Sequence, residues 1–144
     1  MSGCGIVLDV DEQHPALVAS RASWRCVQAH DKLGWLDLMA DDVVIEDPVG
    51  GGPTNPDGAG ARGRDEVAAF YDRNIAENDL TISCEQTFLA SSPLEVAHVL
   101  SLRSAFPGGG ASTVRGIFTY RVREDGKLTS MRGYWTMGDL TFET

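Results

Sequence analysis

The segment "ADDVVIEDPVGGG" (residues 40–52) contains an apolar run, Val43-Val44-Ile45, that ends abruptly at Asp47-Pro48. The β-branched side chains predict a buried strand. Proline ends that strand because it lacks a backbone N–H and fixes its own φ angle. Asp47 therefore lies at a strand end, and two interpretations stay open: its carboxylate faces a pocket, or it begins an Asx turn before the proline.

Three helices are predicted around this strand. Pro15 suits a first helical turn, and apolar residues recur at helical spacing over residues 15–30. A second, short helix is predicted over residues 33–40, directly before the strand at residues 43–46. A third is predicted over residues 64–77, where Val67, Phe70 and Ile75 share one face.

The second half of the chain has the alternating pattern of β-strands. Apolar and polar residues alternate over residues 80–85 and again over residues 96–102. Asp125-Gly126 predicts a hairpin between strands at residues 113–123 and 128–137. Helices followed by long antiparallel strands predict a single α+β domain whose curved sheet wraps around the helices.

The composition argues against several classes of function. The 144 residues are 42% hydrophobic, which suits one globular domain with a core and a pocket. A net charge of −9 with only 12 basic residues opposes nucleic-acid binding. No apolar stretch approaches the roughly 20 residues of a membrane-spanning helix. Because residues 1–5 also carry no basic start of a secretory signal, a cytoplasmic protein is expected.

Neither a cofactor nor a metal is expected. The chain has no phosphate-binding glycine loop and no paired-histidine motif. Cys4, Cys26 and Cys84 are far apart, which favours reduced thiols over disulfides or a zinc site. Residues 50–63 contain six glycines and two prolines and are expected to form a loop. That loop is either a pocket rim that opens for a ligand or plain surface coil.

Three motifs point to a known family: "SWRCVQAHD" (residues 23–31), "LMADDVVIEDP" (38–48) and, near the end of the chain, "MRGYW" (131–135). They resemble bacterial ketosteroid isomerases, and most closely the mycobacterial ketosteroid-isomerase-like proteins of the NTF2-like superfamily, over residues 17–138. The resemblance implies a conical α+β fold, with three N-terminal helices packed on a curved, mixed, mainly antiparallel sheet around an apolar pocket. It implies one domain at residues 14–140, after an N-terminal extension at residues 1–13.

The resemblance also implies a homodimer formed through sheet faces. Thr129, Arg132 and Tyr134 lie on the last predicted strand, where outward-facing polar side chains suit a mixed interface.

The resemblance assigns a catalytic role to Asp47. In the family, the aspartate of the matching "DPVG" motif moves a proton between carbon atoms of a steroid. A carboxylate that faces an apolar pocket is partly desolvated, which raises its affinity for a proton and suits a general base. Tyr71 matches a supporting tyrosine of the family and is the second catalytic candidate.

The family's donors to the developing oxyanion are missing. Its helix-one tyrosine aligns near Ser23 or Trp24, and its strand aspartate aligns near Phe118. Losing one such donor typically costs on the order of 10²–10³ in rate, so a weak isomerase at best is expected. Tyr71, Trp24 and His98 are the candidate replacement donors.

Seven side chains are candidates for contacts with a ligand, and Trp135 falls at the family's pocket aromatic. The alternative is that they are ordinary core residues, with His98 hydrogen-bonded inside the core. These candidates are Trp24, Trp35, Phe70, His98, Phe118, Met131 and Trp135.

The predicted function is that of a steroid delta-isomerase-like protein that binds a steroid or another polycyclic apolar ligand. One alternative is a non-catalytic steroid- or lipid-binding module, which the missing donors favour. Another is an epoxide hydrolase or polyketide cyclase-like enzyme, in which Asp47 and Arg132 would supply two members of an Asp-Arg-Asp arrangement. A third is a scaffold that associates only through its sheet face.

Overall fold

The computed structural model describes residues 14–144, and the predicted N-terminal extension at residues 1–13 lies outside them. Helices dominate the first half of this region and strands the second. No helix of residues 14–144 is long and apolar enough to cross a membrane. The elements are α2 (Pro15–Gln28), α3 (Lys32–Asp37), β1 (Met39–Glu46), β2 (Ala61–Arg62), α4 (Gly63–Asn74), β3 (Asp79–Leu89), β4 (Glu95–Ala105), β5 (Ala111–Val122), β6 (Leu128–Tyr134), the 3-10 helix η2 (Met137–Asp139) and β7 (Leu140–Glu143).

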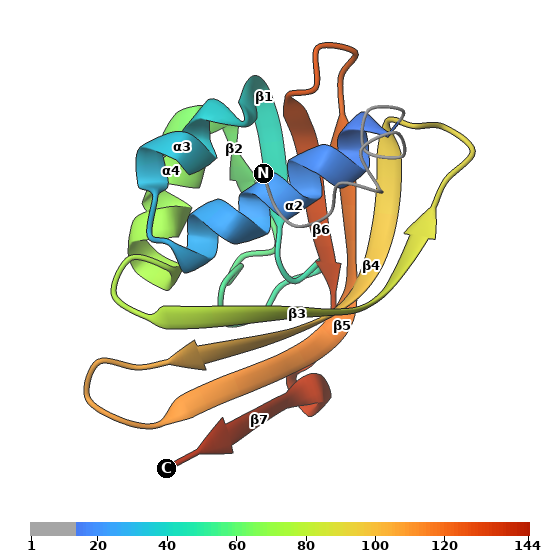
Figure 1. Ribbon diagram of the computed structural model, residues 1–144. Coiled ribbons are helices and arrows are strands. Elements are labelled where there is room, and N and C mark those ends of the chain that lie inside the picture. The colour runs from blue at the N-terminus through green and yellow to red at the C-terminus, as the bar shows by residue number, and fades with distance from the viewer. Residues whose placement is uncertain (1–13) are drawn as a thin grey trace.

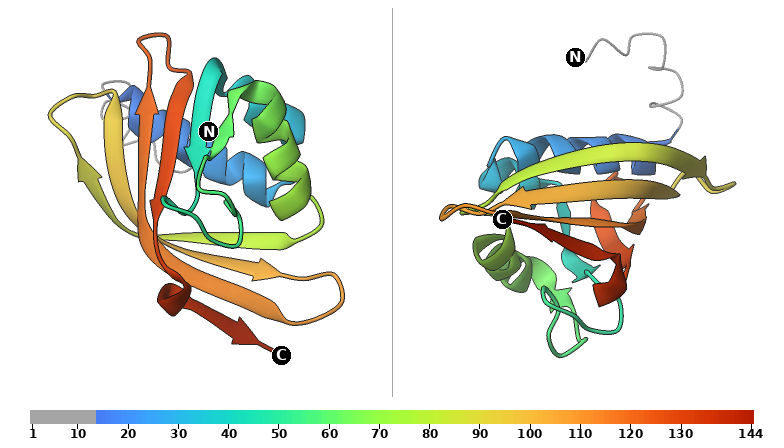
Figure 2. Two further views of the ribbon diagram at one scale, coloured as in Figure 1. Left: turned by 180° about the vertical axis from the view of Figure 1, so that it is seen from behind. Right: turned by 90° about the horizontal axis from the view of Figure 1, so that it is seen from below.

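One mixed sheet forms the body of the molecule. Its strands follow the order β2-β1-β6-β5-β4-β3, with β7 added against β5. Only β1 and β6 pair in parallel, and every other pair is antiparallel. Figures 1 and 2 show that the sheet bends strongly and that all three helices lie on its concave side. The predicted α+β cone with a mainly antiparallel sheet is confirmed.

Local sequence signals account for several element ends. Pro15 occupies the first turn of α2, where its missing N–H leaves no helical hydrogen bond unmade. The Asp31 carboxylate accepts a hydrogen bond from the Gly34 amide at 2.9 Å and so caps α3. Gly126, at φ 86°, turns the chain between β5 and β6 where Asp125-Gly126 predicted a hairpin.

Strand β1 begins earlier than predicted. Residues 39 and 40 were expected to end the second helix, but Met39 opens the strand and pairs with Leu128 of β6. Both Met39 and Ala40 are buried. A short apolar run fits a helix or a strand equally well, and pairing with β6, almost ninety residues later, decides between them.

The last strand begins at residue 140, where the domain was predicted to end, and continues to residue 143. Strand β7 pairs with the first half of β5, with Leu140 opposite Val114 and Glu143 opposite Ala111. The turn of η2 is closed by a capping box between Thr136 and Asp139. The chain after β6 therefore returns to the sheet and adds Leu140 and Phe142 to the wall of the cavity described below.

Candidate functional site

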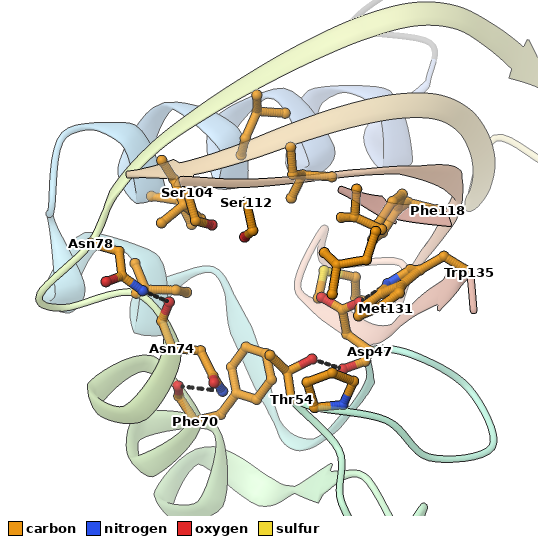
Figure 3. Close-up of a pocket in the computed structure, with 18 of the residues that line it drawn as sticks. Asp47, Thr54, Phe70, Asn74, Asn78, Ser104, Ser112, Phe118, Met131 and Trp135 are labelled. Atoms are coloured by element: carbon orange, nitrogen blue, oxygen red, sulfur yellow. Dashed lines mark hydrogen bonds between the residues drawn. The ribbon is translucent and has the colours of Figure 1, made fainter. Parts of the chain in front are cut away.

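A cavity of about 370 Å³ lies between the helices and the bent sheet. This volume is within the range of about 300–1,000 Å³ that is typical of small-molecule sites. Most of the side chains around it are apolar or aromatic, and Figure 3 shows polar groups gathered at two ends. The apolar part of the lining includes Trp24, Val27, Trp35, Phe70, Ile75, Leu80, Ile82, Leu102, Val114, Phe118, Met131, Trp135, Leu140 and Phe142.

Asp47 lies at one end of the cavity, directly after β1. Its Oδ1 accepts a hydrogen bond from the Trp135 indole N–H at 2.6 Å. Burial among apolar side chains raises the pKa of Asp47 from 3.8 to about 6, and the Trp135 hydrogen bond opposes that rise. No other group of residues 14–144 bonds to the carboxylate, so its second oxygen is left for a ligand.

Gly133 on β6 makes room for the Asp47 carboxylate. A Cβ atom at this position would lie 2.7 Å from Asp47 Oδ1 and 2.6 Å from Cε2 of Phe118, which is paired with Gly133 across the sheet. Any larger residue would push one of these side chains out of place. The glycine in the "MRGYW" motif therefore serves the site directly.

The glycine-rich segment after Asp47 is a structured loop. The buried Asn55 side chain donates to the Pro48 carbonyl and accepts from the Gly60 amide, both at 2.9 Å. The Thr54 hydroxyl donates to the Asp47 carbonyl oxygen, and Thr54 also lines the cavity. The loop is thus part of the cavity wall, as the pocket-rim interpretation expected, and buried Asn55 holds it in place.

Six of the seven predicted ligand-contact residues line the same cavity as Asp47. His98 does not: its Nε2 lies 3.0 Å from the Ser20 hydroxyl and its Nδ1 lies 2.8 Å from the Thr87 hydroxyl. With both ring nitrogens engaged and the side chain fully buried, His98 is a core histidine. Burial lowers the pKa of His98 to about 4, with smaller contributions from Arg21 and His14. The six that line the cavity are Trp24, Trp35, Phe70, Phe118, Met131 and Trp135.

Tyr71 is also outside the lining of the cavity. Its ring packs on Trp35, with ring centroids 5.5 Å apart, and it is buried in α4. The structure therefore gives Tyr71 a packing role behind a cavity residue, and the predicted direct contact with a ligand is missing.

Two hydroxyl groups in the cavity wall were not predicted as hydrogen-bond donors from the sequence. Tyr120 on β5 accepts a hydrogen bond from the Trp24 indole N–H at 2.9 Å, and Ser23 on α2 accepts one from the Trp35 indole N–H at 2.9 Å. Both hydroxyl-bearing residues are buried and line the cavity. Tyr120 shares its strand face with Phe118, two residues earlier, so the alternation of β5 was the available signal.

The SnoaL-like domain family matches residues 20–131, which is well over half of the chain. The chain belongs to this family. Curated protein sequences gave no match.

Three similar solved structures each cover 90% of this chain, and 99% of each of those chains is matched. Rv0760c from Mycobacterium tuberculosis in complex with estradiol-17beta-hemisuccinate is 61% identical, with a TM-score of 0.87. The Delta 5-3-ketosteroid isomerase from Mycobacterium sp. is 55% identical, with a TM-score of 0.89. A computationally designed 17-OHP binder is 56% identical, with a TM-score of 0.89.

The Asp-Arg-Asp arrangement considered above is not assembled in this SnoaL-like domain. Arg132 donates to Glu46 Oε1 at 2.9 Å and to the Tyr134 hydroxyl at 2.8 Å, and it does not line the cavity. Within residues 14–144, Asp47 is the only carboxylate in the cavity lining. Water activation between two aspartates therefore has no basis here.

Proposed function

We propose that this SnoaL-like domain binds a steroid or a similar polycyclic apolar ligand and that Asp47 is a general base that moves a proton between carbon atoms of that ligand. The observation that carries the proposal is a carboxylate with a pKa of about 6 in the wall of a mainly apolar cavity. Such a group is ionised at neutral pH yet accepts a proton readily. The similarity to a ketosteroid isomerase and to a protein bound to a steroid ester supports the ligand class.

The mechanism needs only this chain and the ligand. The Trp135 N–H holds Asp47 Oδ1, so the carboxylate keeps one orientation and presents Oδ2 to the ligand. Asp47 takes a proton from the carbon next to a ketone, and the C–H electron pair moves into the carbonyl group to form an enolate. The carboxylic acid then returns the proton to a carbon two positions further along, which leaves the double bond conjugated.

A non-catalytic binding protein is the second candidate, and Phe118 favours it. The Phe118 ring occupies the wall beside Asp47, where the resemblance placed a second acid. A fluorescence titration followed by an assay of conjugated-enone formation separates the candidates. Trp24, Trp35 and Trp135 all line the cavity, so ligand binding should change tryptophan emission. Binding without enone formation identifies a binding protein, and absence of binding contradicts both candidates.

The far end of the cavity carries polar groups that suit a second oxygen on the ligand. Ser104 on β4 and Ser112 on β5 are directly paired across the sheet, and Figure 3 shows them together, away from Asp47. Neither hydroxyl has a hydrogen-bond partner among residues 14–144. Asn78, beside them in the lining, uses its amide N–H₂ on the Asn74 carbonyl and keeps its side-chain oxygen available.

Replacing Ser104 by alanine should therefore weaken the binding of a steroid that carries an oxygen at ring D. The expected loss of affinity is up to about tenfold, the usual value of one net hydrogen bond. The affinity for the same steroid without that oxygen should stay the same. Calorimetric titration of both steroids into both proteins gives the comparison. Ser101→Ala, on the same strand but on the opposite face, is the matched control. An equal loss for both steroids would show that Ser104 acts only in packing.

We also propose that the outer face of the sheet forms a homodimer. Ile117 and Tyr134 are paired across β5 and β6 and are 47% and 44% exposed, and Val99 lies beside Ile117 on β4. These side chains form a row on three adjacent strands, with Ile117 and Tyr134 exposed and Val99 half-buried, and such a row fits an interface between copies. Sedimentation should give twice the chain mass of 15.5 kDa. Ile117→Glu should shift that mass to the monomer, whereas a monomeric native protein contradicts the proposal.

A further inference from the structure

We infer that Tyr120 and Ser23 together bind the ligand's carbonyl oxygen and donate the hydrogen bonds that stabilise it as an enolate. The inference rests on the proposed function, because it names the groups that complement Asp47 in the same cavity. Tyr120 and Ser23 would replace the family's oxyanion donors, which are missing at the positions expected from the sequence.

The direction of two hydrogen bonds carries the inference. An indole N–H can only donate, so the Tyr120 oxygen must accept from Trp24 and the Ser23 oxygen must accept from Trp35, each at 2.9 Å. Each hydroxyl proton must then point elsewhere. Neither hydroxyl donates a hydrogen bond to any group within residues 14–144. Two O–H donors are therefore available in the cavity wall.

Burial makes these unused donors significant. Tyr120 and Ser23 are each only 3% exposed, so bulk water does not compensate a missing acceptor as it would at the surface. A ligand oxygen that accepts from a buried, unsatisfied donor gains more than one that accepts from a solvated donor. Donation from the indoles also polarises both hydroxyls, which strengthens the hydrogen bonds they make in turn.

Tyr120 stays protonated under the conditions of catalysis. Burial raises the pKa of the Tyr120 phenol well above its ordinary value of 10, and the charge on Asp47 contributes to the same shift. Tyr120 and Asp47 line the same cavity, so both can face one ligand. A neutral phenol can donate to a developing oxyanion, whereas a phenolate could not.

The aromatic neighbours hold these donors in place before any ligand arrives. The rings of Trp24, His98 and Tyr120 pack together, with the Trp24 centroid 4.6 Å from that of His98 and 6.3 Å from that of Tyr120, and the His98 and Tyr120 centroids 5.8 Å apart. His98 is itself fixed by its bonds to Ser20 and Thr87. The engaged core histidine thus positions Trp24, and Trp24 positions the Tyr120 hydroxyl. Donors that need no reorientation are the ones that stabilise a transition state most effectively.

The atoms balance in this arrangement. The proton leaves the carbon beside the ketone for Asp47, and the electron pair of that C–H bond becomes the enolate π system with its charge on the carbonyl oxygen. Tyr120 and Ser23 hydrogen-bond to that oxygen and keep their own protons throughout. When the proton returns from Asp47 to the more distant carbon, the oxygen becomes a carbonyl again. No other reactant is required.

A binding experiment tests the assignment without needing turnover. A 3-ketosteroid and the same steroid without the 3-oxygen are titrated into the native protein, Tyr120→Phe and Tyr134→Phe. Native protein should prefer the ketone by about tenfold, and Tyr120→Phe should lose a large part of that preference, with only Ser23 left to donate. Tyr134→Phe removes a hydroxyl on the outer face of the sheet, so this variant should keep the native preference for the ketone. Ser23→Ala should reduce the preference partly, because Tyr120 still donates.

Turnover gives the second measurement. Where the native protein isomerises a β,γ-unsaturated ketosteroid, Tyr120→Phe should lower kcat by about 10²-fold and change KM far less, because the donor acts mainly on the enolate. A native protein that binds neither steroid contradicts the proposed function itself. A native protein that binds both steroids equally well, or a Tyr120→Phe variant that keeps the preference for the ketone, contradicts only the assignment of the donors.

Discussion

Replacement of Asp47 by asparagine should lower the rate of enone formation by about 10²–10⁴-fold and leave steroid binding largely intact. Asparagine has the shape of aspartate, and its side-chain oxygen can still accept the Trp135 N–H. It cannot accept a proton from carbon, so the chemical step is lost while the cavity is preserved. The measurement is enone absorbance for the native protein and the variant, with binding followed by tryptophan fluorescence.

Asp42→Asn is the matched control for this experiment. Asp42 lies on β1, the strand that Asp47 follows, but its side chain is exposed. Its charge can therefore be removed without changing the cavity. The control should isomerise at the native rate. Isomerisation by Asp47→Asn at the native rate would show that another group is the base, although the cavity contains no second carboxylate among residues 14–144.

The same variant should change how stability depends on pH. The pKa of Asp47 is raised on folding, from 3.8 to about 6, so its contribution to stability is largest below pH 3.8 and is lost as the pH rises through 6. The pKa of His98 is lowered on folding, from 6.5 to about 4, so its contribution is largest above pH 6.5 and is lost as the pH falls through 4. The two groups oppose each other across one pH window.

Each shift corresponds to at most about 3 kcal/mol, at 1.36 kcal/mol for one pKa unit. Between about pH 4 and pH 6.5, the stability from Asp47 falls with rising pH while the stability from His98 rises. In the native protein these two pH dependences therefore largely cancel. Asp47→Asn leaves only the histidine, so this variant should be more stable than the native protein near neutral pH and should lose that advantage on acidification. If Asp47 is the base, as proposed, its ionisation comes with a less stable fold.

Urea unfolding of both proteins at several pH values measures this difference. Subtracting the two curves removes the contribution of every carboxylate that the proteins share, so that Asp47 alone remains. We expect the difference in unfolding free energy to shrink as the pH falls from about 7 to 4. A difference that is independent of pH would mean that Asp47 keeps an ordinary pKa, and its assignment as a tuned base would lose its main support.

Much of the fold could be predicted because its signals are local. The strand end at Asp47-Pro48, the proline at the start of α2 and the Asp125-Gly126 turn each depend on a few neighbouring residues. The alternation along β5 likewise shows that Phe118 and Tyr120 share one face. These features do not require knowledge of any distant partner.

The donor groups of the site could not be predicted in the same way. Trp24 and Tyr120 are 96 residues apart, and Ser20 and His98 are 78 residues apart, yet each pair is joined by one hydrogen bond. From the sequence, Trp24 and His98 were candidate donors to a ligand. In the structure the Trp24 N–H is engaged by Tyr120 and the His98 ring by Ser20 and Thr87.

The sequence by itself determined which residue types lie on the inner face of each element, including an acid at the end of β1 and an aromatic-rich wall. Tertiary structure alone decided which of them reach the cavity and which polar atoms remain free there. The physical reason is that a hydrogen-bonding group has a limited number of partners, and distant segments brought together by the bend of the sheet take some of them. What is left unpaired around Asp47 is set by the packing of α2 against β4 and β5, which no local pattern encodes.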